Sequence, residues 1–189
     1  MRYPKQLRLP DALPHETIRA LIGAVRHPVC RAFFSTQYMC GLRIGEARDL
    51  PPENVQAKQH RLRIIGKGDK ERFVPLPDAL LTLLRDTWRE HRNPTRVFAT
   101  RPSAPIGRGG TLYDAFVAAR KEAGVPHVTT HVFRHSYATR LLERGVQLPV
   151  VQILMGHANL RTTMIYTHLT EPVREGIRQT LDTIAADLL

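Results

Sequence analysis

Three residues with clear chemical potential lie on a predicted helix that begins near residue 130. His131, Arg134 and His135 stand at positions i, i+3 and i+4, so their side chains share one helix face. A guanidinium offers a fork of donors to two phosphate oxygens, and an imidazole donates or accepts a proton beside it. The spacing is therefore compatible with a phosphate-directed face. A solvated arginine and a histidine in the capping turn fit the same spacing equally well.

The two histidines also have the i, i+4 spacing of a zinc-binding helix. The residues between them are Val-Phe-Arg, with no glutamate after the first histidine, so the HExxH pattern is missing. An arginine between two ligands would repel a cation, and no carboxylate ligands lie nearby. We therefore expect no metal site. We expect no cofactor either, because the chain has no glycine-rich loop of the kind that cradles phosphates.

The charge of the chain points to a polyanionic partner. Its formal net charge is +11 and its pI is about 10.5, which favours nucleic acid over an anionic membrane. Although the chain carries 17 acidic residues, only Glu143 falls between residues 123 and 170. A surface that approaches phosphates would exclude carboxylates, because like charges repel at short range. The distribution therefore places the expected DNA-facing surface in this segment.

Hydrophobic periodicity predicts a mainly α fold with a small antiparallel three-stranded β-sheet. The sheet is expected within residues 54–75, with β-prone runs on either side of a turn whose tip carries Lys67. Gly41 is expected to end a helix in the left-handed conformation, and Thr130 to cap the start of another. The predicted helices are 14–27, 29–39, 43–50, 77–92, 111–123, 130–144, 149–155, 160–168 and 172–187, with a loop at 93–110.

The two cysteines are expected to be buried free thiols. Cys30 and Cys40 fall in one predicted helix, ten residues and thus about 15 Å apart along its axis. A disulfide needs Cα atoms within roughly 7 Å, so these two residues cannot form one inside a regular helix. They are also too few for a four-cysteine zinc site.

Four motifs in a fixed order give a more specific signal than any single residue. His157 precedes Tyr166 by nine residues, and each alone would pass for an ordinary turn or core residue. Together with the helix at 131, however, they closely resemble the catalytic core of the tyrosine recombinases, which include phage and integron integrases and Xer-type resolvases. The motifs are GLRIGEARDL at 41–50, IGKGDKERFVPL at 65–76, HVFRHSYAT at 131–139 and LMGHANLRTTMIYTHL at 154–169.

The resemblance implies a role for six residues and a metal-free, ATP-free reaction. The nucleophile would join DNA as a 3′-phosphotyrosyl intermediate, which a 5′-hydroxyl can later reverse. By motif position, Tyr166 would attack the phosphorus, and Arg43 and Arg134 would clamp the phosphate. His131 would act as general base, and Lys67 would protonate the leaving 5′-oxygen. His157 would donate a further hydrogen bond.

The resemblance also sets expectations for organisation and partners. We expect one catalytic domain over 1–189, with a basic lead-in at 1–13 and a C-terminal helix at 172–189. The roughly 40 residues before the first motif are too few for the family's N-terminal core-binding domain. The expected partner is double-stranded DNA, bound by a chain that is monomeric alone and forms a homotetramer on synapsed DNA through its C-terminal helix.

The expected location is the bacterial cytoplasm, at the nucleoid when the protein is bound to DNA, and not a membrane.

Two other functions remain open at this point. A type IB topoisomerase-like enzyme would use the same Arg, Lys and Tyr chemistry to relax supercoils. A DNA-binding module without recombination activity would need none of that chemistry.

Overall fold

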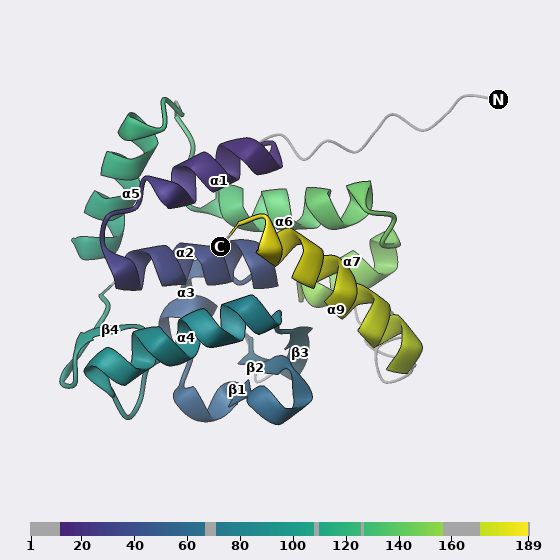
Figure 1. Cartoon of the computed structure of the whole chain (residues 1–189), viewed down its shortest axis with the longest axis horizontal. Helices are drawn as coiled ribbons and strands as arrows, with labels where there is room; N and C mark the ends of the chain where they lie inside the picture. The colour runs from purple at the N-terminus through teal and green to yellow at the C-terminus, as the bar shows by residue number, and fades with distance from the viewer. Residues whose placement is uncertain (1–11, 67–70, 108–109, 126, 157–170, 189) are drawn as a thin grey trace.

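A central buried helix organises the molecule. The computed structural model describes residues 12–66, 71–107, 110–125, 127–156 and 171–188. Helix α2 (Pro28–Cys40) runs through the middle of the view in Figure 1, and every residue from 32 to 40 is buried. Two of its buried polar side chains bond to backbone carbonyls: Thr36 Oγ1 donates to Ala32 and Gln37 Nε2 donates to Leu42. The helix is packed by α1 (His15–Gly23), α4 (Asp78–His91), α5 (Thr111–Glu122) and α6 (His131–Glu143).

Aromatic rings join α2 to α5 and α6. The rings of Phe34 and Phe133 stack with centroids 5.1 Å apart, and Phe116 meets Phe133 edge-on at 5.9 Å. Phe33 packs against Phe98 in the same way at 5.2 Å. Because Phe133 lies next to Arg134 in sequence, this packing fixes the face of α6 that carries the predicted phosphate-directed residues.

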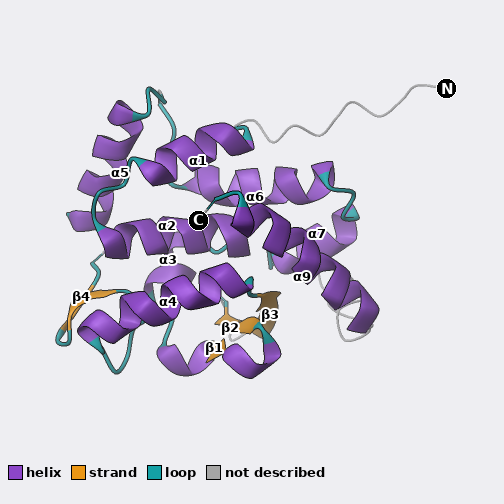
Figure 2. Ribbon diagram, in the orientation of Figure 1, coloured by secondary structure: helices purple, strands orange, loops and turns teal. Residues whose placement is uncertain are grey.

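The predicted three-stranded antiparallel sheet is confirmed. Its strands are β1 (Val55–Gln56), β2 (Arg61–Ile65) and β3 (Glu71–Pro75), in the order β1-β2-β3, and Figure 2 shows them beside the helices. Leu62 pairs with Val74, and Ile64 pairs with Arg72. All four side chains are buried, as expected for one face of a sheet packed on the core. The tip at 67–70, with Lys67, lies outside the described residues.

The prediction of a loop at 93–110 is partly wrong, because this segment contains a second small sheet. Strands β4 (Ala99–Arg101) and β5 (Ala104–Pro105) pair antiparallel across a register shift. Contacts distant in sequence hold this segment in place: the Val97 amide donates to the Leu50 carbonyl at 2.9 Å. Strands this short carry no alternating pattern, so hydropathy could not have revealed them.

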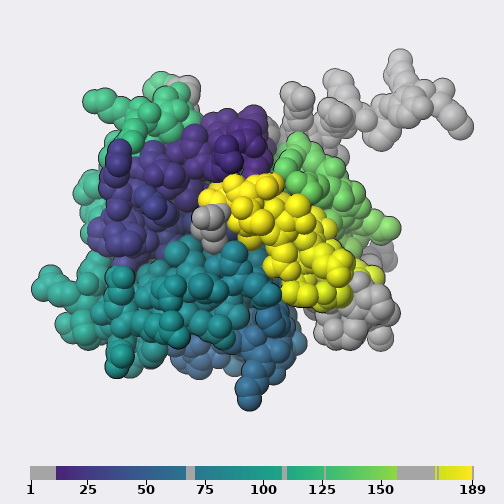
Figure 3. All heavy atoms as spheres, in the orientation of Figure 1, coloured from purple at the N-terminus to yellow at the C-terminus, as the bar shows by residue number. Residues whose placement is uncertain are grey.

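The remaining helices of the described residues are α3 (Ile44–Arg48), α7 (Leu148–Leu154) and α9 (Glu171–Ala186), with short 3-10 turns at Pro52–Asn54 and Ala57–Gln59. In Figure 3, α9 lies across the visible face of the molecule, and it contacts α2, α4 and β3 of the same chain. Its buried side chains, among the residues whose burial is described, are Ile177, Leu181, Ile184 and Ala185. The predicted helix at 160–168 falls outside the described residues. None of the described helices has the length and apolar character needed to span a membrane.

Two of the local predictions are confirmed, and a third is confirmed only in its position. Gly41 ends α2 in the left-handed region, with φ of 61°, and Cys30 and Cys40 are buried free thiols. Thr130 does stand at the start of α6, but its side chain makes no capping hydrogen bond. Its backbone is already helical, whereas a capping hydroxyl normally acts from an extended residue.

Replacing Gly41 with alanine should destabilise the fold by about 3 kcal/mol, from left-handed backbone strain and overpacking together. An added Cβ would lie 2.4 Å from a ring carbon of the buried Tyr137. Urea unfolding measures the loss. The matched control is Gly23→Ala, because Gly23 is in α1 and an added Cβ there meets nothing within 4 Å. Equal stability of the two variants would contradict this account of Gly41.

Candidate active site

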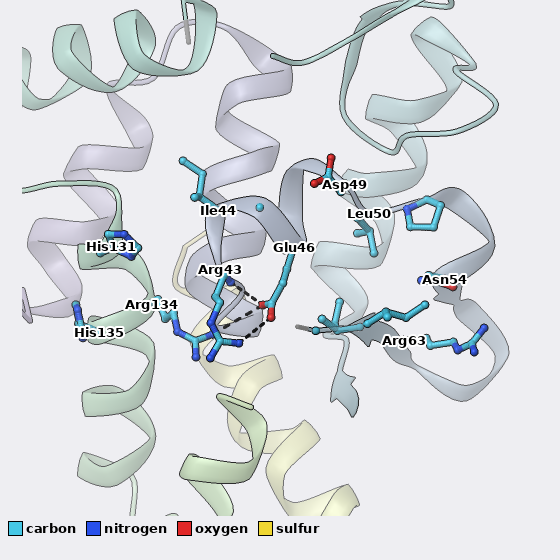
Figure 4. Close-up of a pocket in the computed structure, with 15 residues that line it drawn as sticks. Arg43, Ile44, Glu46, Asp49, Leu50, Asn54, Arg63, His131, Arg134 and His135 are labelled. Carbon is cyan, nitrogen blue, oxygen red and sulfur yellow. Dashed lines mark hydrogen bonds and ion pairs between the residues drawn. The ribbon is translucent and has the colours of Figure 1, made fainter. Parts of the chain in front are cut away.

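One pocket collects the side chains that could bind a phosphate. Its volume is about 760 Å³, and it lies between α3, strand β2 and the first turns of α6 (Figure 4). Arg43, His131 and Arg134 all line it, although about 90 residues separate the first from the other two. We refer to this cavity as the arginine pocket. Its other lining residues are Ile44, Gly45, Glu46, Asp49, Leu50, Pro51, Asn54, Arg63, Ile64, Ile65, Gly66 and His135.

Arg134 is held by the backbone on both sides of its guanidinium. Its Nη1 donates to the Gly41 carbonyl and its Nη2 to the Met155 carbonyl. Burial, and then the positive charge of Arg43, lower its pKa to about 10, so it still carries its charge at neutral pH. Five N–H donors leave an arginine further bonds to make after these two. Arg134 is therefore a fixed cation that can still accept an anionic ligand.

Glu46 is the carboxylate at the centre of the cluster. Figure 4 shows its carboxylate beside the side chains of Arg43 and Arg134. The Arg43 amide and its Nη1 each donate to Glu46 at 2.8 Å, and Arg72 donates through Nη1 and Nη2 at 2.8 and 2.7 Å. Burial acts to raise the pKa of Glu46, but the bonds and charge of Arg72 and the bonds from Arg43 outweigh it and lower the pKa to about 2.

The cluster keeps an excess of positive charge. Three guanidinium groups, those of Arg43, Arg72 and Arg134, surround the single Glu46 carboxylate. Arg43 is the most accessible of the three, with 44% of its side chain exposed, and its Nη2 also donates to the Gly156 carbonyl at 3.2 Å. An ordered and partly exposed group of cations suits a phosphodiester.

The structure brings together three of the six residues predicted from the sequence. Arg43, His131 and Arg134 line the same pocket, whereas Lys67, His157 and Tyr166 lie outside the described residues. The residues that immediately precede Lys67 and His157 are described, and both lie at the arginine pocket. Gly66 lines the pocket, and the Gly156 carbonyl accepts a hydrogen bond from Arg43.

Comparison with known proteins places the chain in a family. The sequence profile of the phage integrase family matches residues 12–172. The chain belongs to this family. The tyrosine recombinase XerD of Shewanella oneidensis is 35% identical over 190 residues, covering 93% of this chain and 63% of the relative. XerC of Agrobacterium fabrum is 39% identical over 172 residues, covering 87% and 54%. The chain thus spans between half and two thirds of the length of these curated relatives.

Solved structures of the phage integrase family confirm the predicted fold. The XerA recombinase superposes with a TM-score of 0.70 at 26% identity, over 95% of this chain and 69% of that one. The XerH site-specific recombinase, bound to its difH substrate in a pre-cleavage complex, gives 0.69 at 25% identity, over 93% and 56%. The fold is therefore that of a tyrosine recombinase catalytic domain, mainly α with a small antiparallel sheet.

Sequence reasoning missed two members of this integrase cluster, Glu46 and Arg72. Arg72 left a faint signal, since it occupies the inward-facing position of strand β3, two residues before the buried Val74. A charged residue at such a position needs a buried partner. The partner lies 26 positions earlier in the chain, on α3, and no local pattern could identify it. Among the described residues, no group of three or more His, Cys, Asp or Glu side chains is arranged to hold a metal ion.

The lowered pKa of Glu46 predicts how this integrase domain responds to acid. A carboxyl group whose pKa is lower in the folded state stabilises the fold above its unfolded pKa of about 4.5 and loses that contribution as the pH falls toward 2. The stability difference between wild type and Glu46→Gln should therefore shrink between about pH 4.5 and pH 2.

Urea midpoints measured across this pH range test the prediction. The control is Glu16→Gln, because Glu16 is exposed on α1 and forms only a surface ion pair with Arg19. A surface pair contributes little, about 0–1 kcal/mol, so this variant should follow the wild-type curve. A stability difference for Glu46→Gln that does not change with pH would contradict the paired, ionised carboxylate.

Proposed function

We propose that the chain is the catalytic domain of a site-specific DNA recombinase or integrase, which cleaves and rejoins strands through a 3′-phosphotyrosyl intermediate. The observation that carries the proposal is the arginine pocket, where Arg43 and Arg134 meet His131 in a cluster with excess positive charge. The relatives with similar sequences are tyrosine recombinases, and the solved structures with the same fold include the XerH site-specific recombinase bound to its difH substrate.

The proposed reaction begins with attack on the scissile phosphate. The phenolic oxygen of Tyr166 forms a new P–O bond while the bond to the 5′-oxygen breaks. His131 takes the phenolic proton, and Lys67 gives a proton to the departing oxygen, which leaves as a hydroxyl. Arg43 and Arg134 neutralise the charge that builds on the non-bridging oxygens, with His157 as a further donor.

Exchange of one phosphodiester for another needs no outside energy source. The bond to tyrosine replaces the bond to the 5′-oxygen, so a 5′-hydroxyl from another strand can attack and restore the DNA. We therefore propose that the reaction requires neither ATP nor a metal ion. The arginines supply the positive charge that a metal would otherwise provide.

We further propose that the partner is double-stranded DNA, that the chain acts as a single catalytic domain, and that it acts in the bacterial cytoplasm. Alone it would be a monomer, and on synapsed DNA a tetramer that exchanges its C-terminal helices. In this chain α9 packs on its own domain through Ile177, Leu181 and Ile184. Exchange would therefore require these side chains to leave their own core and enter the equivalent site of a neighbour.

A covalent-capture experiment tests the proposed function. The protein is incubated with a library of nicked duplexes of random sequence, in which the short strand beyond the cleavage site diffuses away and traps the intermediate. We expect DNA that remains bound to protein after denaturation, enriched in particular sequences. Binding of the duplexes without any covalent product would contradict the proposal and favour a DNA-binding module. Adducts without sequence preference would instead favour topoisomerase-like relaxation.

A further inference from the structure

Arg72 joins three segments that surround the arginine pocket. It projects from strand β3 and only 8% of its side chain is exposed. Two of its nitrogens donate to Glu46 on α3, and its Nε donates to the Leu154 carbonyl at the end of α7, at 3.0 Å. One side chain thus ties the β-hairpin, the first arginine motif and the segment that leads to His157.

The chain after α7 also passes close over this guanidinium. A Cβ added at Gly156 would lie 2.9 Å from Nη1 of Arg72 and 3.1 Å from its Cζ. Gly156 has φ of 65°, a conformation that glycine adopts without strain. The absence of a side chain at this residue lets the backbone approach Arg72 and places the Gly156 carbonyl within reach of Arg43.

Net stability alone does not explain this arrangement. Burying an ion pair costs desolvation that the attraction only partly repays, and apolar side chains of similar size often serve as well. The bidentate contact between Arg72 and Glu46 supplies a fixed geometry instead. The same carboxylate accepts hydrogen bonds from the backbone amide and from Nη1 of Arg43. The position of the carboxylate therefore determines where the Arg43 guanidinium lies.

Arg72 acts through its partners and not on the ligand. It is absent from the residues that line the arginine pocket, whereas Arg43, Glu46 and Arg134 are present. We infer that Arg72 is a positioning residue for strand cleavage, holding Glu46 and the end of α7 so that Arg43 and Arg134 face one phosphate. This inference rests on the proposed recombinase function.

A double-mutant cycle tests the inference. The variants are Arg72→Met, Glu46→Gln and the two combined, each assayed for single-turnover adduct formation at saturating DNA. Each single change should slow cleavage by about 100-fold, the effect of misplacing catalytic groups by about 1 Å. The double variant should be no slower than the slower single variant, because both changes break the same link. Losses that multiply to about 10⁴-fold would overturn the inference.

Two further variants separate positioning from folding. Arg72→Lys keeps the charge but lacks the planar fork and the Nε bond to the Leu154 carbonyl, so it should lose less stability than Arg72→Met while its cleavage remains as slow. Recovery of both stability and rate in Arg72→Lys would overturn the positioning role. The matched control is Arg61→Lys on strand β2, where Arg61 bonds Gln56 and stacks 4.0 Å from the centre of the Phe73 ring, away from the pocket. Its cleavage rate should equal that of wild type.

Urea unfolding of the same variants tests the pairing of Arg72 with Glu46 without any measurement of activity. If Arg72 and Glu46 are paired as described, the double variant should be more stable than the sum of the two single losses predicts. Additive losses would overturn the inference even for an inactive protein. A wild-type chain that forms no adduct at all would contradict the proposed function instead, so the two failures are distinguishable.

Discussion

Replacing Tyr166 with phenylalanine should abolish the covalent DNA adduct while leaving DNA binding intact. Phenylalanine keeps the ring but lacks the oxygen that would attack phosphorus, so the protein can bind its site and proceed no further. A free tyrosine has a pKa of about 10 and is a poor nucleophile at neutral pH. The reaction therefore depends on both the hydroxyl and the cations that surround the phosphate.

The Tyr166→Phe experiment needs a control that removes an equivalent hydroxyl elsewhere. Tyr113 lies on α5 with 65% of its surface exposed and is not among the residues that line the arginine pocket, so Tyr113→Phe should form adduct at the wild-type rate. Adduct is detected as labelled DNA that migrates with protein on a denaturing gel. An adduct that survives in Tyr166→Phe would identify a different nucleophile and overturn the assignment of Tyr166.

The helices could be predicted because their apolar residues follow the helical period closely. Ile18, Leu21 and Ile22 mark the buried face of α1, and all three lie in the core. Boundaries set by glycine were also predictable, since Gly41 ends α2 where only a residue tolerant of positive φ fits easily. The start of α2 was missed by one residue. Pro28 was expected to end the previous helix, whereas α1 already ends at Gly23 and Pro28 forms the first turn of α2.

The candidate site could be predicted only where motif residues carry the signal. Arg43, His131 and Arg134 were named from the sequence, and the structure gathers them in one pocket. The buried pair of Glu46 and Arg72 depends on how β3 packs against α3, which is a tertiary contact with no local pattern. Sequence motifs therefore reveal the residues that contact the ligand. They do not as readily reveal the residues that hold those side chains in position.

Replacing Arg134 with alanine or lysine should slow single-turnover cleavage by about 10²- to 10³-fold, the usual cost of removing one donor that stabilises charge in the transition state. Lysine keeps the charge but cannot bond two backbone carbonyls and a phosphate in one plane. Arg134 makes both carbonyl bonds, to Gly41 and to Met155, so a lysine here would be free to turn away from the pocket.

The comparison of Arg134→Lys with wild type is made at saturating DNA and well below the melting temperature, because the lost carbonyl bonds will also reduce stability. The control is Arg140→Lys, six residues further along α6, where Arg140 pairs with Glu143 and does not line the pocket. Its rate should stay within about threefold of wild type, because lysine keeps the positive charge opposite Glu143 and a partly exposed pair of this kind contributes little. If Arg134→Lys cleaves as fast as this control, then Arg134 has only a structural role, in which it links the end of α2 to the end of α7. Arg43 would in that case have to neutralise the charge on the phosphate.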